Sequence, residues 1–555
     1  MLKLEALSRL ERNARRTGEI VGVLAKYGLA DWLSGLKFDW VQERLRTTDG
    51  QAIRELRLAE RLRRALTELG PTFIKLGQVL STRPDLVGPE MATELSELQA
   101  NTAADAIAHV RALIQAELGR PPEALFASFD DTPLASASIA QVHRATLPDG
   151  RTVVVKVQHA GIEPLVAADL AILEGLAEFA EKHAPVLRPY QPVAVTRQFH
   201  RSLMRELDFR RERQNLEDFA HNFAGDATVR FPATYREFCS KRVLTMDFLD
   251  GVSSSEPAKL AQSGVDLGEF ARRGANIYLN MIFRDGFYHA DPHPGNLMVL
   301  PGGVVGVLDC GMTGRIDEHL RDEFESLLLA ALASDAGGLA DVVLRMGACP
   351  ADCPRDRLRA DLNDFVADHL GHSLQDLDLS AALNQLVGII RRYHIVLPAR
   401  LSLLLKTLVE LEGTARLFAA DFSLAEVSEP HCVQAMHRRY SPKQLFSRVQ
   451  RSLRNWERFA GMLPRDLAEL LDRVRSGTFA VHLDHRHLDP IINRLVLGVI
   501  VAALIIGASA LWSRQAPPIV AGVPVLGALG FGMAAYLSYR LARAIKKSGD
   551  VDSKD

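Results

Sequence analysis

Two short segments near the middle of the 555-residue chain constrain its fold more than any other feature. Residues 289–296 read H-A-D-P-H-P-G-N, and an apolar run at 304–308 then leads into Asp309. Asp291 and Asp309 supply two carboxylates, and Asn296 supplies an amide five residues after the first Asp. Mg²⁺ is commonly held by one or two such oxygen ligands together with substrate phosphates. The ordered pair of segments therefore predicts a magnesium-nucleotide site, although either segment alone is compatible with an ordinary turn.

The spacing is that of the protein-kinase catalytic loop, H-x-D-x-x-x-x-N, followed by the D-F-G metal ligand. By this comparison Asp291 positions or deprotonates the attacking oxygen, whereas Asn296 and Asp309 bind the metal. Cys310 replaces the Phe of D-F-G, and no A-P-E sequence follows at the usual distance. The sequence therefore predicts phosphoryl chemistry without the segment that binds a protein substrate.

An alanine-rich segment precedes the predicted phosphate lysine. Residues 135–142, A-S-A-S-I-A-Q-V, match the kinase pattern G-x-G-x-x-G-x-V with alanine at each glycine position. After a Pro-Asp-Gly turn, the β-branched run 152–157 places Lys156 where kinases have V-A-I-K. Alanine resists positive φ and adds a methyl group. We therefore expect a stiffer loop that lies further from the phosphates than a glycine loop.

Residues 243–251 predict a strand that leaves through a glycine turn, which is either the adenine-binding hinge between the lobes or an ordinary edge strand. The predicted nucleotide-binding residues are Ala135, Ser136, Ala137, Ser138, Ile139, Ala140, Val142, Lys156 and Met246.

In this order, the motifs resemble those of the UbiB/AarF family of atypical protein-kinase-like proteins, which is associated with ubiquinone biosynthesis. The resemblance runs from about residue 71 to about residue 314 and includes K-x-G-Q at 75–78 and E-x-D at 206–208. In that family the K-x-G-Q segment belongs to an N-terminal helical extension that packs over the active site. The resemblance therefore implies pocket or regulatory roles for Lys75, Gln78, Asp208 and Glu212.

The ion-pair partner of Lys156 has three candidates. Kinases place a Glu on the next helix, and Glu174 lies on an apolar-periodic segment soon after the strand. The family motif points instead to Glu206, with Glu212 further along the same motif. We predict Glu206 as the catalytic partner of Lys156, keep Glu212 as the alternative, and interpret Glu174 as a solvated helix position.

Two apolar runs near the C-terminus, 495–512 and 519–539, predict membrane insertion. Each approaches the ~20 residues needed to cross a bilayer. Only Arg514 lies in the connection, whereas the outer ends carry Arg494, Arg540, Arg543, Lys546 and Lys547. The positive-inside rule then places both ends, and the catalytic domain, on the cytoplasmic side of the inner membrane.

Charge and cysteine content exclude other classes. The formal net charge of −2 argues against nucleic acid as a partner. The five cysteines form no C-x-x-C motif, which fits free thiols in a reducing cytoplasm.

The predicted fold class is α+β: a protein-kinase-like two-lobed fold with an N-terminal helical extension and a C-terminal transmembrane helical hairpin. The expected segments are the extension at 1–125, the N-lobe at 126–245, the C-lobe at 246–430, a helical linker at 431–490 and the hairpin at 491–547.

The predicted function is that of a membrane-anchored atypical kinase or ATPase that uses ATP and Mg²⁺. The resemblance implies that it supports ubiquinone biosynthesis by acting on or extracting membrane-embedded isoprenoid lipid intermediates. Its expected partners are membrane lipids, quinone intermediates and other ubiquinone-biosynthesis proteins. The alternatives are a small-molecule kinase, a protein kinase and a non-catalytic nucleotide-gated lipid chaperone.

Overall fold

The computed structural model describes residues 13–29, 56–98, 102–184, 188, 190–347, 349, 353–369, 378–439, 488–520 and 523–548. The chain divides into two units, Met1–Leu445 and Phe446–Asp555, which are described separately below. Most of the linker expected at 431–490 lies outside the described residues, because helix α20 ends at Arg439 and the description resumes at Leu488.

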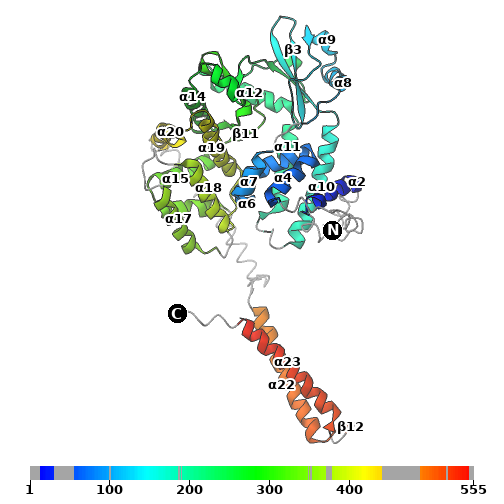
Figure 1. The fold of residues 1–555 in the computed structure, drawn as a ribbon. Coiled ribbons are helices and arrows are strands. Elements are labelled where there is room, and N and C mark those ends of the chain that lie inside the picture. The colour runs from blue at the N-terminus through cyan, green and yellow to red at the C-terminus, as the bar shows by residue number, and fades with distance from the viewer. Residues whose placement is uncertain are drawn as a thin grey trace, which may run out of the picture. The chain divides into compact units, whose positions relative to one another are not determined.

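The N-lobe is built on a five-stranded antiparallel sheet in the order β1–β3–β4–β6, with β2 also paired to β3 (Figure 1). Successive residues of a strand point to opposite faces of the sheet, and β4 is buried on both faces. One face packs beneath helices α8 and α9 through Val153, Val155 and Val157. The other face joins the main core through Val154 and, on β6, Met246. The elements are β1 (Ser128–Phe129), β2 (Ala135–Ser136), β3 (Ala140–Thr146), β4 (Thr152–Gln158), β6 (Val243–Asp247), α8 (Ile107–Leu118) and α9 (Pro122–Leu125).

Three helices lie in the chain between β4 and β6, and they decide which carboxylate reaches the sheet. They are α10 (Ile162–His183), α11 (Pro192–Glu206) and α12 (Phe209–Asn222). Helices α10 and α11 pack against each other, whereas α12 packs against β6. Glu174 on α10 lies 2.7 Å from Nδ1 of His200 on α11, so its side chain is paired rather than solvated.

The N-terminal extension consists of α2 (Ala14–Lys26), α4 (Leu58–Leu69), α5 (Pro71–Ser81), α6 (Pro84–Val87) and α7 (Pro89–Ser96). These helices share an apolar core with Ile172 of α10. Arg16 Nε donates to the fully buried Asp169 of α10 at 2.7 Å. On the C-lobe side, Asp85 accepts from the backbone N–H of Leu397 at 3.3 Å. The extension therefore contacts both lobes of the kinase-like body.

The C-lobe combines a small sheet, in the order β5–β10–β9–β7, and the pair β8–β11 with a set of helices. Strand β6 leaves through Gly251, as predicted, where an added Cβ would lie 2.6 Å from the carbonyl oxygen of Val299. The strands are β5 (Val229–Arg230), β7 (Val252–Ser253), β8 (Phe287–His289), β9 (Leu297–Leu300), β10 (Val304–Val307) and β11 (Thr313–Arg315). The helices are α13 (Pro257–Gln262), α14 (Leu267–Leu279), α15 (Glu318–Leu332), α16 (Ala336–Met346), α17 (Arg355–His369), α18 (Leu379–Arg392), α19 (Ala399–Phe418) and α20 (Leu424–Arg439), with a π-helical turn at Asn280–Asp285 and 3-10 turns at Arg236–Phe238, Pro294–Asn296 and Pro301–Gly303.

The second unit contains α22 (Leu488–Ser513), the short strands β12 (Ile519–Val520) and β13 (Val523–Pro524), and α23 (Val525–Ser548). The two helices pack closely because Gly530 faces Ala508, where an added Cβ would meet the alanine methyl at 3.0 Å. Within the described residues, one stretch, Val496–Ser513, is long and apolar enough to cross a membrane, with a mean hydropathy of 2.3 and 11% of it buried. The apolar part of α23, Val525–Leu541, is shorter.

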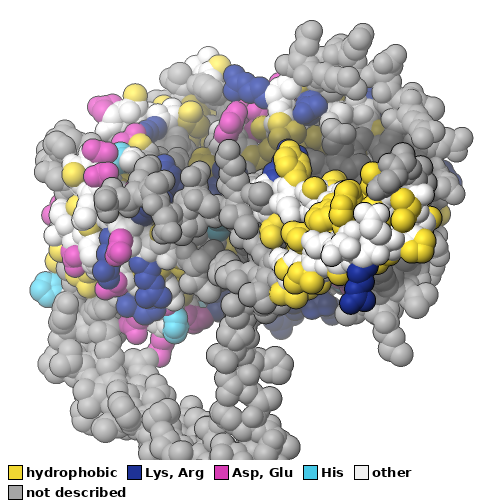
Figure 2. Space-filling model, turned by 90° about the horizontal axis from the view of Figure 1, so that it is seen from below, with side chains coloured by type: hydrophobic (Ala, Val, Ile, Leu, Met, Phe, Trp, Pro, Cys, Tyr) yellow, Lys and Arg dark blue, Asp and Glu magenta, His cyan; other side chains and the backbone are white. Residues whose placement is uncertain are grey.

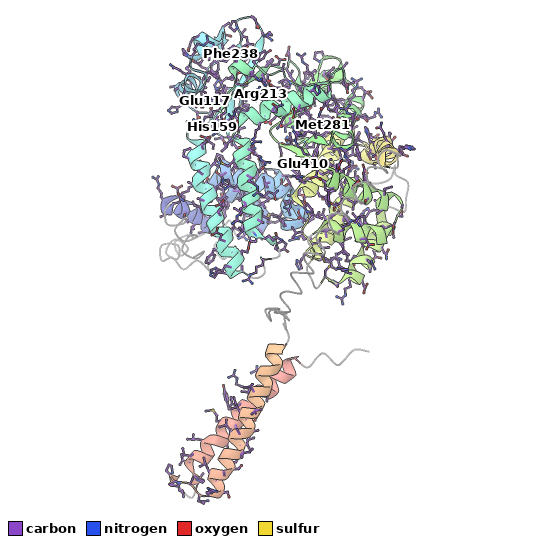
Figure 3. The ribbon with its side chains drawn as sticks, turned by 180° about the vertical axis from the view of Figure 1, so that it is seen from behind. Glu117, His159, Arg213, Phe238, Met281 and Glu410 are labelled. Carbon is purple, nitrogen blue, oxygen red and sulfur yellow. The ribbon has the colours of Figure 1, made fainter. Side chains whose placement is uncertain are left out.

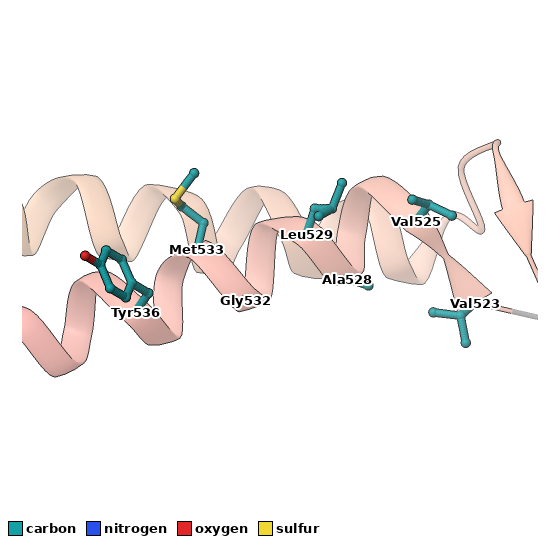
Figure 4. Close-up of a pocket in the computed structure, with 7 residues that line it drawn as sticks. All are labelled: Val523, Val525, Ala528, Leu529, Gly532, Met533 and Tyr536. Atoms are coloured by element: carbon teal, nitrogen blue, oxygen red, sulfur yellow. The ribbon is translucent and has the colours of Figure 1, made fainter.

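The surface of this helix pair is largely apolar (Figure 2). Ile506 on α22 is 70% exposed, and Leu529 on α23 is 65% exposed. Figure 4 shows Leu529, Met533 and Tyr536 along one side of α23, where they line an open apolar groove of about 630 Å³. An apolar exterior of this kind is typical of a surface that contacts lipid.

Candidate active site

The hairpin β9–β10 brings two predicted metal ligands together. Val307 pairs with Leu297, and the next residue on each strand continues the ladder, since the Leu308 N–H donates to the carbonyl of Asn296 at 2.9 Å. Asp309 follows directly. The hairpin register therefore places Asn296 and Asp309 side by side at its open end.

A second strand pair, β8–β11, positions the catalytic loop against the same segment. Thr313 pairs with His289, and the Ala290 N–H donates to the carbonyl of Met312 at 2.9 Å. His289 is 1% exposed, and its Nδ1 accepts from the Asp291 N–H at 3.2 Å. Its Nε2–H is then directed to the carbonyl oxygen of Asp309. One buried imidazole therefore connects the two acidic residues through their backbones.

The side chain of Asp291 is oriented by Asn296. The Asn296 amide nitrogen donates to Asp291 Oδ2 at 2.9 Å and to the Asp291 carbonyl at 3.1 Å. These bonds occupy the amide nitrogen and leave the amide oxygen as the ligand atom for a cation. From α19, the hydroxyl of Thr414 donates to the carbonyl of Pro292 at 2.9 Å, so a C-lobe helix supports the loop from below.

Lys156 is shared by two carboxylates. Its Nζ lies 2.8 and 2.9 Å from the two oxygens of Glu212 and 3.1 Å from Oδ2 of Asp309. The prediction that Glu206 pairs with Lys156 is therefore wrong, and the alternative, Glu212, forms the pair. Lys156 and Glu212 are 9% and 5% exposed, so this ion pair is screened little by solvent.

The local helix boundaries explain the exchange of partners. Glu206 is the last residue of α11, and α12 begins two residues after Leu207. Asp208 caps α12 by accepting from the Arg210 N–H, and it also pairs with the Arg210 side chain at 2.8 Å. Glu212 lies one turn inside α12, on the face that packs on the sheet. Asp208 therefore serves as a helix cap, and Glu212 is the motif residue that reaches Lys156.

Glu206 instead forms an ion pair with Lys75 of the N-terminal extension. Burial alone lowers the pKa of Lys75, but Glu206, Asp309 and Asp291 together raise it above its ordinary value. Gln78, one turn further along α5, donates to the carbonyl of Leu98 at 3.1 Å and so stays within the extension. The structure thus brings Lys75 to the acidic site and places Gln78 outside its hydrogen-bonded network.

The two carboxylates that pair with Lys156 have opposite pKa shifts. Burial raises the pKa of Glu212 to about 7. The negative charges of Asp309 and Glu206 act in the same direction, and Lys156 offsets the increase only in part. Burial also acts to raise the pKa of Asp309, but Lys156, the Gly311 N–H and Lys75 outweigh it and hold this pKa below its usual range. The site therefore keeps Asp309 ionised, as a metal ligand must be.

Helix α12 also fixes the D-C-G segment, a contact to which the sequence prediction gave no role. The side-chain amide of Asn215 donates to the carbonyl of Cys310 at 2.9 Å. Asn215 lies three residues after Glu212 and therefore on the same helix face. That spacing is the sequence signal that could have placed Asn215 beside the site. The Cys310 side chain is completely buried in the main core. No disulfide joins the five cysteines, all of which the structure describes.

The alanine segment forms a tight hairpin turn between β2 and β3. The Ala137 N–H donates to the carbonyl of Ala140 at 2.8 Å. Among the described residues, non-glycine positions with positive φ are Gln191, Ser334, His394 and Gln515. The alanines of the turn therefore adopt ordinary backbone angles. Register aligns Ala135, Val142 and Lys156 across three strands, so these predicted nucleotide-binding residues share one face of the sheet, and Met246 shares it as the partner of Val154.

The donor set fits a magnesium ion. The described residues contain no cluster of three His, Cys, Asp or Glu side chains that could hold a metal unaided. Asp309 and Asn296 offer one carboxylate and one amide oxygen, and Mg²⁺ typically completes such a shell with phosphates and water. The Asp309 side chain remains 45% exposed, which leaves room for those ligands.

A two-lobed body with a lysine–glutamate pair in the N-lobe and an Asp, Asn, Asp set in the C-lobe defines a kinase-like protein. The matched domain models agree: an ABC1 atypical kinase-like domain covers residues 97–343, a UbiB helical domain covers 362–423, and an ABC1/UbiB kinase-like C-terminal domain covers 482–547. The chain belongs to the ABC1/UbiB family of kinase-like proteins.

Individual relatives match nearly the whole chain. A Clostridium pasteurianum protein described as "Uncharacterized protein in hydrogenase 1 5'region" is 30% identical over 542 residues, covering 96% of this chain and 99% of its own length. A "Probable protein kinase UbiB" from Pseudomonas fluorescens is 34% identical over 486 residues, covering 86% of this chain and 89% of its own length. A solved complex of Rv3197 with erythromycin from Mycobacterium tuberculosis aligns with a TM-score of 0.44 at 23% identity. The alignment covers 68% of this chain and 96% of that chain.

Proposed function

We propose that this protein is a membrane-anchored atypical kinase or ATPase that uses Mg-ATP to support ubiquinone biosynthesis. The observation that carries the proposal is the shared position of Lys156 between Glu212 and Asp309. A buried lysine that faces both a helix glutamate and a metal-binding aspartate is the arrangement that kinases use to hold the α- and β-phosphates. The family supplies the link to ubiquinone biosynthesis.

The residues divide the reaction among them. Asn296 and Asp309 would hold a Mg²⁺ ion, which would neutralise charge on the phosphate oxygens. Lys156, already held by Glu212, directs its ammonium group toward the phosphates, and Glu212 keeps it there. Asp291, oriented by Asn296, accepts the proton of the attacking water or hydroxyl as the bond from the γ-phosphorus to its bridging oxygen breaks. Lys75 adds a second positive charge near the same carboxylates.

We assign the membrane anchor to the C-terminal helix pair. The stretch Val496–Ser513 has the length and hydropathy of a spanning helix, and α23 packs along it. We infer that both helices cross the bilayer and that the kinase-like body lies on the cytoplasmic side, because basic residues flank the outer ends. Membrane-embedded isoprenoid intermediates are then the substrates or cargo within reach.

Phosphate release by the purified full-length protein tests the proposal. We expect Mg-dependent release of phosphate from ATP that increases when the protein is placed in anionic liposomes containing a quinone-like lipid. The same liposomes without the quinone-like lipid separate a response to the bilayer from a response to the substrate class. Binding of Mg-ATP without phosphate release under all of these conditions would favour a nucleotide-gated lipid chaperone instead.

A further inference from the structure

His159, the first residue after β4, connects the strand of the phosphate lysine to the alanine turn. Its Nε2 lies 2.9 Å from the carbonyl oxygen of Ala137. Its backbone N–H donates to the carbonyl of Ile139 at 3.0 Å. The side chain is 7% exposed and lies where the N-lobe sheet meets the start of α10 (Figure 3). A single residue therefore holds the turn at two positions, in a place where water competes little for either bond.

The protonation pattern of this contact follows from the chemistry of its partners. A carbonyl oxygen only accepts, so Nε2 of His159 carries the proton that bonds to Ala137. The other ring nitrogen, Nδ1, lies 3.2 Å from Oδ2 of Asp105. Asp105 is itself held, because Oδ2 accepts from the Ala160 N–H at 2.8 Å and the Asp105 N–H donates to Gln141 at 2.7 Å. Nδ1 itself makes no hydrogen bond, so the ring is held to the turn through its Nε2–H bond alone.

The contact acts from the face of the sheet opposite the nucleotide. Lys156 points toward α12, whereas its neighbours Val155 and Val157 pack into the core beneath α8. Asp105 lies two residues before α8 and approaches His159 from that same side. Substitution of His159 therefore alters the turn without removing any group that faces the phosphates.

We propose that His159 is a positioning residue for the nucleotide, which holds the alanine turn in place through its Nε2–H bond to the carbonyl of Ala137. This inference rests on the proposed nucleotide site. It assigns the stiffness of the turn to a specific hydrogen bond in addition to the alanine composition. Loss of the bond leaves a turn that must be ordered when nucleotide binds, and ordering mobile groups lowers affinity.

His143 on β3 provides a matched control. It is 0% exposed, and its Nδ1 lies 2.8 Å from the carbonyl oxygen of Asp130, so it resembles His159 in burial and in bonding to a backbone carbonyl. Its contacts run to Gln141 and Asp130 at the β1 edge of the sheet. A general weakening of the sheet would appear in both His→Leu variants, whereas loss of the contact to the turn would appear only at His159.

The experiment uses the full-length protein, with His159→Leu, His159→Gln and His143→Leu compared with the parent. Amide hydrogen exchange at 137–140 is measured without nucleotide, and the Kd is measured for Mg-ADP. We expect His159→Leu to speed exchange and to raise the Kd, each by about tenfold. His159→Gln, whose amide N–H can replace the Nε2–H donor, should recover most of both effects, and His143→Leu should change neither by more than about twofold.

Three results would overturn the inference: parental exchange and Kd in His159→Leu, failure of His159→Gln to recover, or equal effects in His143→Leu. If His159→Leu does not fold, His159→Phe replaces it, because it keeps an aromatic ring but has no N–H to donate to Ala137. Parental protein that does not bind Mg-ADP would contradict the proposed nucleotide site itself. Parental binding that is unchanged in His159→Leu would contradict only the role of His159.

Discussion

Lys75 of helix α5 forms an ion pair with Glu206, the terminal residue of helix α11. This pair lies beside a second one, Lys156 with Glu212, and both belong to the set of charges around Asp309. The N-terminal extension therefore contributes a lysine to the active site. The roles of the two lysines can be tested separately, because each lysine pairs with a different glutamate.

The first prediction separates the two glutamates. Glu212→Gln removes the charge that holds Lys156, and we expect kcat/KM for ATP to fall by a factor on the order of 10², the scale of a 1 Å misplacement of a catalytic group. Glu206→Gln should leave Lys156 in place and affect the site through Lys75, with a smaller loss. Steady-state phosphate release by the two variants measures this, and a larger loss in Glu206→Gln would reverse the assignment of the pairs.

The second prediction concerns pH. The pKa of Glu212 in the folded protein is raised to about 7, so Glu212 gains a proton, and Lys156 loses a charged partner, as the pH falls through 7. We expect kcat/KM, which reports on the free enzyme, to decline on the acid side with a midpoint near pH 7. Glu212→Gln should lack this midpoint while it experiences the same titration of ATP. An identical acid limb in parent and variant would show that another group titrates.

The same shift has a definite sign for stability. Between the unfolded value of 4.5 and about 7, the folded protein holds a proton on Glu212 that the unfolded chain has released. Folding stability contributed by this group therefore decreases as the pH rises through that interval. Glu212→Gln should flatten this part of the curve of unfolding free energy against pH.

The sequence predicts the site residues that lie close together in the chain, but not those whose position depends on helix boundaries. Asp291, Asn296 and Asp309 lie just beyond the ends of the strands β8, β9 and β10, so motif spacing was enough to bring them together. The partner of Lys156 was mispredicted because it depends on where α11 ends and α12 begins. Glu212 lies six positions after Glu206, and a helix break between them decides which one faces β4. Motif order contains no information on that break.

Tertiary contacts made by the extension were also outside the reach of sequence patterns. Lys75 was assigned to the pocket only through a family resemblance, because a single lysine on an amphipathic helix is usually solvated. His159 follows a strand and belongs to no motif of its own, and its proposed role depends on its contacts with the turn at Ala137 and Ile139. Such contacts join residues that are distant in the chain, and no local periodicity encodes them.

A third prediction concerns the contact between the extension and the C-lobe. Arg83 and Asp85 form a buried pair with bonds of 2.9 and 2.8 Å, and both also bond to the backbone of Leu397. Asp85→Asn leaves Arg83 without its counter-charge and should lower the unfolding free energy by about 3 kcal/mol. Glu90→Gln, which disrupts the exposed pair with Arg57, is the control and should leave the thermal midpoint almost unchanged. Equal midpoints in the two variants would argue against a stabilising contact.

The fourth prediction concerns the anchor. Truncation before Arg494 removes the apolar parts of both C-terminal helices. The shortened protein should leave the membrane fraction or bind it weakly and in a salt-dependent manner, since only surface contacts remain. Fractionation with a high-salt wash measures this. Full retention of the truncated protein after the wash would contradict the assignment of the anchor to this helix pair.

Phosphate release from Mg-ATP by the Asp309→Asn variant tests the central claim most directly. Asparagine keeps an oxygen that can accept from the Gly311 N–H, a bond of 2.7 Å in the parent, so the segment should retain its conformation. It removes the negative charge that faces Lys156 and that would bind the metal. We expect folded protein whose turnover is lower than that of the parent by at least about 10². Hydrolysis of ATP at the parental rate by folded Asp309→Asn would contradict the site described here.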